Sequence, residues 1–172
     1  KYNYRNNLAH FYIYAYDNRP EVIAKAYRSE AALKYFSKGI TLAKELGNEK
    51  LVNDAYQKNI MLASTNGMNE IALLYSVRNY QFTSEDDLQS IGRLLSGIGY
   101  NLSALGKAKE ALEFYNRANH VFMEQRLPED IAETCYNYAL TQIAEGEYKD
   151  AEVYMQYAMM IVEKLHLNSI RV

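Results

Sequence analysis

Apolar and polar residues alternate along this chain with the spacing of amphipathic helices. Between Glu21 and Leu46 the apolar positions recur at intervals of three, four or seven residues, at Val22, Ala26, Leu33, Phe36, Ile40 and Ala43. The same pattern predicts helices at about 2–16, 49–65 and 68–80, one from about 85 to Gly106, and three more ending near 125, 146 and 165. No segment of strand-like sequence has a second such segment to pair with, so the sequence predicts an all-α fold.

Residues 99–118 predict two helices folded back on one another. A helix ends before Gly106, which marks a tight turn, and a second helix follows. Small residues at Gly99, Ala111 and Ala118 would let two antiparallel helices approach closely, and the aromatic residues beside them would fill the remaining space. This stretch is therefore expected to form a helical hairpin.

The hairpin pattern repeats with a period of about 40 residues. An alanine recurs at Ala32, Ala72, Ala111 and Ala151. An aromatic residue follows each alanine by three positions, at Tyr35, Tyr75, Phe114 and Tyr154, and turn glycines recur at Gly67, Gly106 and Gly146. The sequence thus predicts one domain, 1–172, with units of about 1–46, 47–82, 83–126 and 127–166. Residues 167–172 look like the start of a fifth unit, which suggests a fragment of a longer protein.

Composition and charge narrow the class of protein. The net charge of -2 gives no overall basic field for nucleic acid, and no long uncharged apolar run suggests a membrane segment. The single cysteine, Cys135, excludes an intramolecular disulfide and fits the reducing cytoplasm. Its neighbours offer no base or cation, so we expect a small buried residue on a helix and not a nucleophile.

The hairpin residues resemble the tetratricopeptide repeat. The third unit matches that family at Leu95, Ile98, Gly99, Gly106, Ala111, Tyr115 and Ala118, and the fourth at Asn137, Tyr138, Ala139, Gly146, Tyr148, Ala151 and Ala158. The resemblance implies a right-handed α-solenoid of about four antiparallel helix pairs with a concave binding groove. A period near 40, above the usual 34 or so, is similar to the long-helix subtype found in bacterial regulators.

The resemblance also implies which residues face the groove, because the first helix of each pair lines the concave side in this family. The residues at these positions are Asp54, Gln57, Met61 and Ser64, then Arg93, Ser96, Tyr100 and Ser103, and then Glu133, Tyr136, Asn137, Leu140 and Ile143. Tyrosine and methionine would give contact area, and the polar residues would satisfy a peptide's polar groups. A single residue at such a position is more often exposed without contacting a ligand than in contact with one.

Motifs that would carry catalysis are not found in the sequence. It has no phosphate-binding glycine loop, nucleophile elbow or metalloprotease helix. His120 and Glu124 lie one helical turn apart without a third ligand, so no metal site is expected. We therefore expect a protein that is not an enzyme and that needs no cofactor.

Two functions remain open at this point. The first is a protein- or peptide-binding module, the sensory or regulatory part of a bacterial cytoplasmic signalling protein or transcriptional regulator. The second is a homodimerisation scaffold attached to a diguanylate cyclase or a histidine kinase. Neither hypothesis includes direct binding to nucleic acid or to a membrane.

Overall fold

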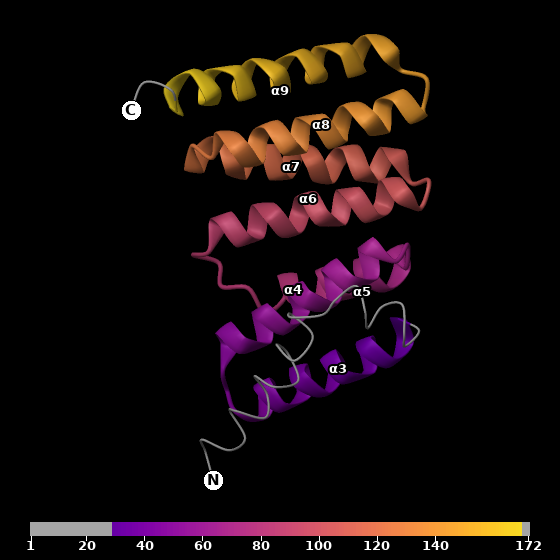
Figure 1. Cartoon of the computed structure of the whole chain (residues 1–172), viewed down its shortest axis with the longest axis vertical. Helices are drawn as coiled ribbons and strands as arrows, with labels where there is room; N and C mark the ends of the chain where they lie inside the picture. The colour runs from indigo at the N-terminus through magenta and orange to yellow at the C-terminus, as the bar shows by residue number, and fades with distance from the viewer. Residues whose placement is uncertain (1–28, 170–172) are drawn as a thin grey trace. The chain divides into compact units, whose positions relative to one another are not determined.

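The computed structural model describes residues 29–169, and within this range the chain forms helices and turns without any strand (Figure 1). This confirms the all-α prediction for the described part of the chain. The predicted helix at 2–16 and the beginning of the 21–46 helix lie outside the described residues. The chain divides into two compact units, one up to Thr83 and one from Ser84 onward, and each is considered by itself.

The first unit contains three described helices. They are α3 (Ser29–Glu45), α4 (Glu49–Thr65) and α5 (Asn69–Tyr80), and α4 packs against both of the others. Apolar residues of α3 and α4 form its main core, with Ile40, Ala43, Leu51, Val52, Ala55 and Tyr56 buried together. The apolar stripe predicted for residues 21–46 thus faces α4 at its last two positions.

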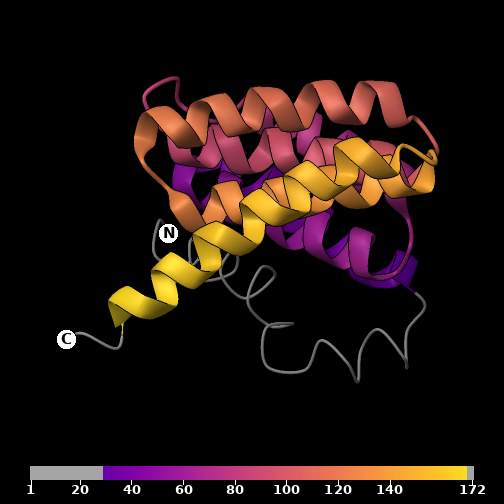
Figure 2. The same ribbon diagram turned by 90° about the horizontal axis from the view of Figure 1, so that it is seen from above.

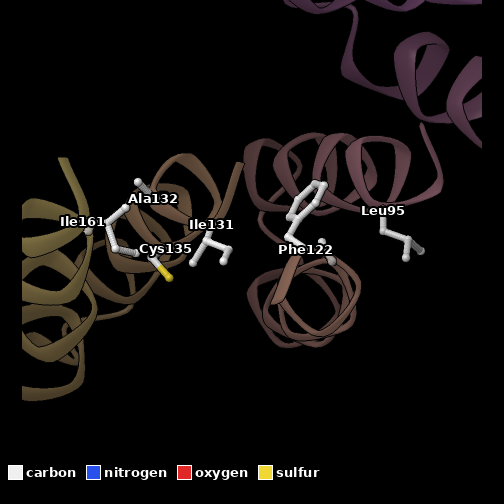
Figure 3. Packing of buried hydrophobic residues seen from close by; sticks show 8 residues of the cluster. Leu95, Phe122, Ile131, Ala132, Cys135 and Ile161 are labelled. Atoms are coloured by element: carbon white, nitrogen blue, oxygen red, sulfur yellow. The ribbon is translucent and has the colours of Figure 1, made fainter. Parts of the chain in front are cut away.

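The second unit contains four helices in sequence. They are α6 (Leu88–Ala104), α7 (Ala108–Gln125), α8 (Pro128–Ala144) and α9 (Tyr148–Ser169). Each packs on the next one along the chain, and α6 also contacts α8. Figure 3 shows the core that joins all four, from Leu95 on α6 through Phe122 on α7 and Cys135 on α8 to Ile161 on α9.

A common turn closes five of these helices. At Gly106 the backbone has φ +74°, the Lys107 N–H donates to the Leu102 carbonyl at 2.9 Å, and the Gly106 N–H donates to the Ser103 carbonyl. This pair of bonds is the Schellman arrangement, which satisfies the free carbonyls at a helix end. Equivalent bonds occur at Gly47, Gly67, Arg126 and Gly146. Arg126 adopts the left-handed conformation with φ 55° although it carries a side chain.

The start of α6 differs from the sequence prediction. The cluster of hydroxyl and acidic residues at 83–87 predicted a helix from about residue 85, whereas α6 begins at Leu88. Asp87 caps the helix, since its Oδ1 accepts from the Ser90 N–H at 3.1 Å. Any of several polar residues in this stretch could have served as the cap, and the sequence does not say which one the backbone presents.

Two glycines bring α6 and α7 close together. A Cβ added to Gly99 would lie 2.8 Å from the Tyr115 ring and 3.1 Å from the Ala111 carbonyl oxygen. A Cβ on Gly92 would lie 2.4 Å from the Phe122 ring. The close packing predicted around Gly99 is confirmed. The close contact of α6 with α7 continues to Gly92, about two turns nearer the start of α6.

Helix α9 is longer than the sequence suggested. We expected it to end near residue 165, and it continues to Ser169. Leu167 and Asn168, which were assigned to the start of a fifth unit, therefore belong to α9, and residues 170–172 lie outside the described range. Seen from above, α9 crosses α8 obliquely and its last turns reach beyond the start of α8 (Figure 2).

Candidate functional site

The residues expected to line a groove fall on three helices. Asp54, Gln57 and Met61 lie on α4 in the first unit. Ser64 lies on α4 as well, and Ile143 is exposed near the end of α8. Eight others lie on two helices of the second unit that contact each other, Arg93, Ser96, Tyr100 and Ser103 on α6 and Glu133, Tyr136, Asn137 and Leu140 on α8. The structure therefore brings these eight residues together on one pair of helices.

Arg93 joins α6 to α8. Its Nε donates to Asp130 Oδ1 at 2.7 Å and its Nη2 to Asp130 Oδ2 at 3.2 Å, a two-pronged ion pair. The hydrogen bond to Asp130 raises the pKa of the Arg93 guanidinium further above its already high value, so this residue stays charged. The charge predicted to meet a ligand is thus already paired within the protein.

Two serines continue this line of contacts. Ser96 Oγ hydrogen-bonds Thr134 Oγ1 at 3.2 Å, and Ser103 Oγ hydrogen-bonds Thr141 Oγ1 at 2.8 Å. The two bonds lie on either side of Tyr100 along α6, so Tyr100 sits beside the middle of α8. We conclude that Ser96 and Ser103 hold the two helices in register, a role that the resemblance did not imply.

The remaining predicted residues form an exposed surface, which we call the α6–α8 face. It consists of Tyr100, Glu133, Tyr136 and Leu140, all exposed, with Tyr100 and Tyr136 about half accessible at 48% and 47%. Asn137 is half-buried beside them, and its carbonyl accepts from Thr141 Oγ1. Asn101 on α6 is buried and its Nδ2 donates to the Gly97 carbonyl, so it does not contribute to this surface.

A second surface lies between α8 and the C-terminal half of α9. It is a groove of about 860 Å³ with an apolar floor, lined by Ala132, Tyr136, Met155, Ala158, Met159, Val162 and Leu165. We call it the α8–α9 groove. Of its residues, only Glu133 and Tyr136 were expected from the sequence to face a binding groove. A usable signal was present, because α9 carries apolar residues on more than the one face that it buries.

Charged residues surround this groove. Glu129 and Glu133 of α8 and Glu163 of α9 line it, together with His166, and all four are exposed. The lining residues thus include three glutamates and neither a lysine nor an arginine. The groove therefore combines apolar contact area with an acidic edge.

A smaller cavity of about 380 Å³ lies on α7, α8 and α9, between Asn119, Cys135 and Tyr154. The buried Asn119 donates from Nδ2 to the Cys135 sulfur at 3.5 Å, and none of the described residues donates to its Oδ1. Burial raises the pKa of the Cys135 thiol, which the Asn119 bond only partly offsets, so the thiol is held protonated. Cys135 is buried on a helix, as the sequence predicted.

Within residues 29–169, histidine, cysteine and carboxylate side chains do not gather in groups of three that could hold a metal ion. In the same range, none of the helices has the length and apolar character that crossing a membrane requires.

Comparison with known proteins gives information on the fold alone. Neither a family model nor a curated protein matches this chain. Among solved structures, the chain is similar to BtubC (BKLC) from P. vanneervenii, with 13% identity, a TM-score of 0.52 and coverage of 96% of this chain and 91% of that one. At this identity the likeness supports a shared all-helical fold and says nothing about function.

Proposed function

We propose that this chain is a protein- or peptide-binding module of the tetratricopeptide type, built as a right-handed solenoid. Its setting would be the cytoplasm of a bacterium, as the sensory or regulatory part of a signalling protein or transcriptional regulator. Three features support this proposal: the 40-residue period of the sequence, the recurrence of one turn geometry between successive helices, and the likeness in fold to a helical protein.

The observation that carries the proposal is the exposed α6–α8 face. Tyr100, Tyr136 and Leu140 each leave more than two fifths of their surface accessible, and Glu133 adds a charge beside them. Tyrosine is favoured in binding surfaces because its rigid ring gives a large contact area and its hydroxyl can still meet water or a partner. Because α6 and α8 are held in register beneath this face, it would present a fixed surface to a peptide.

Selection from a displayed library of 16-residue peptides, followed by calorimetry on the best binders, tests the proposal. Replacing Tyr100 and Leu140 by alanine should weaken peptide binding at least tenfold, because both side chains would contact the peptide. Both are exposed, so the substitutions should leave the core intact. Tyr148→Ala is the matched control, because Tyr148 is also exposed but lies at the start of α9. Failure to enrich any peptide, or equal loss in the control, would overturn the proposal.

A further inference from the structure

We infer that the α8–α9 groove binds a basic amphipathic helix of a separate polypeptide. This inference rests on the proposed function, that the chain is a binding module. It names the kind of partner and a place that adjoins the α6–α8 face and shares Glu133 and Tyr136 with it. It follows from comparing the two hairpins of the second unit, whose turn glycines lie 40 residues apart, at Gly106 and Gly146.

The residues 40 positions before those of the groove are their equivalents in the preceding repeat. They form a surface on α6 and α7 that helix α8 covers. Met159 corresponds to Asn119, which contacts Cys135 of α8, and Met155 corresponds to Tyr115, whose ring lies 6.4 Å from that of Tyr138 on α8. Val162 corresponds to Phe122, which is buried. The groove is therefore the equivalent of a helix-docking surface, and in the described chain its place is taken by no helix.

The charges specify the occupant. At the first of these two surfaces, Arg93 of α6 pairs with Asp130 of the docked helix α8. At the groove the position of Arg93 is taken by Glu133, so the charge is reversed, and Glu129 and Glu163 add to it. A docked helix should carry lysine or arginine where α8 carries Asp130.

The spacing of the contacts specifies the apolar side of the partner. Helix α8 meets its neighbours through Ile131, Cys135 and Tyr138, at positions i, i+4 and i+7. The expected partner repeats this spacing with apolar residues and has a basic residue at i−1. Two methionines in the groove suit such a helix, because the unbranched side chain adapts to differently shaped partners.

A separate polypeptide is favoured by charge, because the residue of this chain equivalent to Asp130 is Ile170, which carries no charge to pair with Glu133. At Arg126 the chain leaves α7 through a left-handed turn, and this reversal lets α8 cover the preceding pair. The equivalent residue of α9 is His166, where the helix continues to Ser169 without turning back. A second copy of the chain fits poorly, because a symmetric contact through this groove would bring its acidic edge against the same acidic edge of the other copy.

Fluorescence anisotropy with labelled 17-residue peptides tests the inference on the intact chain. The first peptide has the α8 sequence, Pro128–Ala144, with Glu129, Asp130 and Glu133 each replaced by lysine, and the second is the unaltered acidic sequence. We expect the lysine peptide to bind at least tenfold more tightly at low salt, with the difference shrinking as salt is added.

Variants of the protein locate the binding site. Met159→Lys places a cation on the apolar floor and should weaken binding of the lysine peptide at least tenfold. Val153→Lys is the matched control, because Val153 is exposed on the same helix but does not line the groove. In the same way, Glu163→Gln should weaken binding and Glu113→Gln, on the exposed side of α7, should not.

Several results would overturn the inference. The two peptides could bind equally well, or the lysine peptide could fail to bind. Val153→Lys could also weaken binding of the lysine peptide as much as Met159→Lys does. A dimer seen by light scattering and abolished by Met159→Lys would show that a second copy occupies the groove. If library peptides still bind and depend on Tyr100 and Leu140, the proposed function stands although this inference has failed.

Discussion

The hairpins α6–α7 and α8–α9 share one repeat register and differ in what covers them. Phe122 is 1% exposed and its equivalent Val162 is 46% exposed; Asn119 is 6% exposed and its equivalent Met159 is 57% exposed. Helix α8 packs on the first pair, and among the described residues no further helix packs on the second. Burial at a repeat position is thus decided by the neighbouring helix and not by the position itself.

The largest expected effect concerns the covered aromatic residue. Phe122→Ala should lower the free energy of unfolding by about 3–5 kcal/mol, because it opens a cavity among α6, α7 and α8. The equivalent change Val162→Ala should lower it by less than about 1 kcal/mol, since the side chain is already half in water. Urea unfolding followed by circular dichroism measures both values. Equal losses would contradict the comparison.

The next effect concerns the close approach of α6 and α7. Gly99→Ala should destabilise the protein by about 1–3 kcal/mol, because the new methyl group meets Tyr115 and the backbone of Ala111. In the second hairpin the equivalent residue is Ala139, which is buried without such a restriction on its Cβ.

Gly97→Ala is the control for this prediction. Gly97 lies on the same helix with no atom near the position of an added Cβ, so alanine there should stabilise by up to about 1 kcal/mol through its helix propensity. Thermal unfolding of both variants gives the sign of each change. A stabilising Gly99→Ala would mean that the two helices can separate without loss.

Alkaline pH should act on the tyrosines of this unit. Burial raises the pKa of Tyr115 and of Tyr154 to about 12, above the value of 10.0 for an exposed tyrosine. Because the unfolded chain loses these protons first, stability is fully present below pH 10 and falls as the pH rises from 10 through 12.

Tyr115→Phe should reduce the loss of unfolding free energy at alkaline pH. The reduction should be on the order of 1–2 kcal/mol between pH 10 and 12, after allowing for solvent screening. Tyr148→Phe removes a well-exposed hydroxyl and is the control, with an unchanged pH profile expected. Unfolding midpoints measured across this range decide the matter. A profile that Tyr115→Phe leaves unaltered would contradict the role of its burial.

The smallest effect concerns the turn that lets α8 fold back. Arg126→Gly should stabilise the protein by about 0.5–1 kcal/mol, because glycine adopts φ 55° without steric strain. This gain is larger than the extra backbone entropy that glycine loses on folding. Lys107→Gly, at a cap residue with φ -99°, should give no such gain. Chemical denaturation resolves the difference, and a destabilised Arg126→Gly would show that the arginine side chain holds the turn.

Much of the fold could be predicted from the sequence because its causes are local. A glycine two residues past a helix end, a proline at the first turn of α8 and an apolar stripe each act within a few residues of the chain. The cap of α6 was misplaced because five adjacent polar residues compete for that position. The length of α9 was underestimated because nothing in its sequence marks a stop near 165.

The candidate site was harder to predict because its residues act through partners about 40 positions away. The resemblance to the tetratricopeptide repeat implied that Arg93, Ser96 and Ser103 face a groove, and the structure pairs them with Asp130, Thr134 and Thr141. Met159 and Val162 were not singled out in the sequence, and the structure places them, exposed, in a groove. Spacing tells which residues share a helix face, but not what that face meets.

By itself, then, the sequence determined that the chain forms helical hairpins at a period of about 40 residues and where most of them turn, since hydrogen bonding at helix ends and the helical period are local properties. Only the tertiary structure decided which of the equivalent faces another helix of the described chain covers, because covering depends on contacts between segments far apart in the sequence. Within the described residues, the chain reverses direction at Arg126, so that α8 packs on the preceding pair, whereas α9 continues through His166 to Ser169.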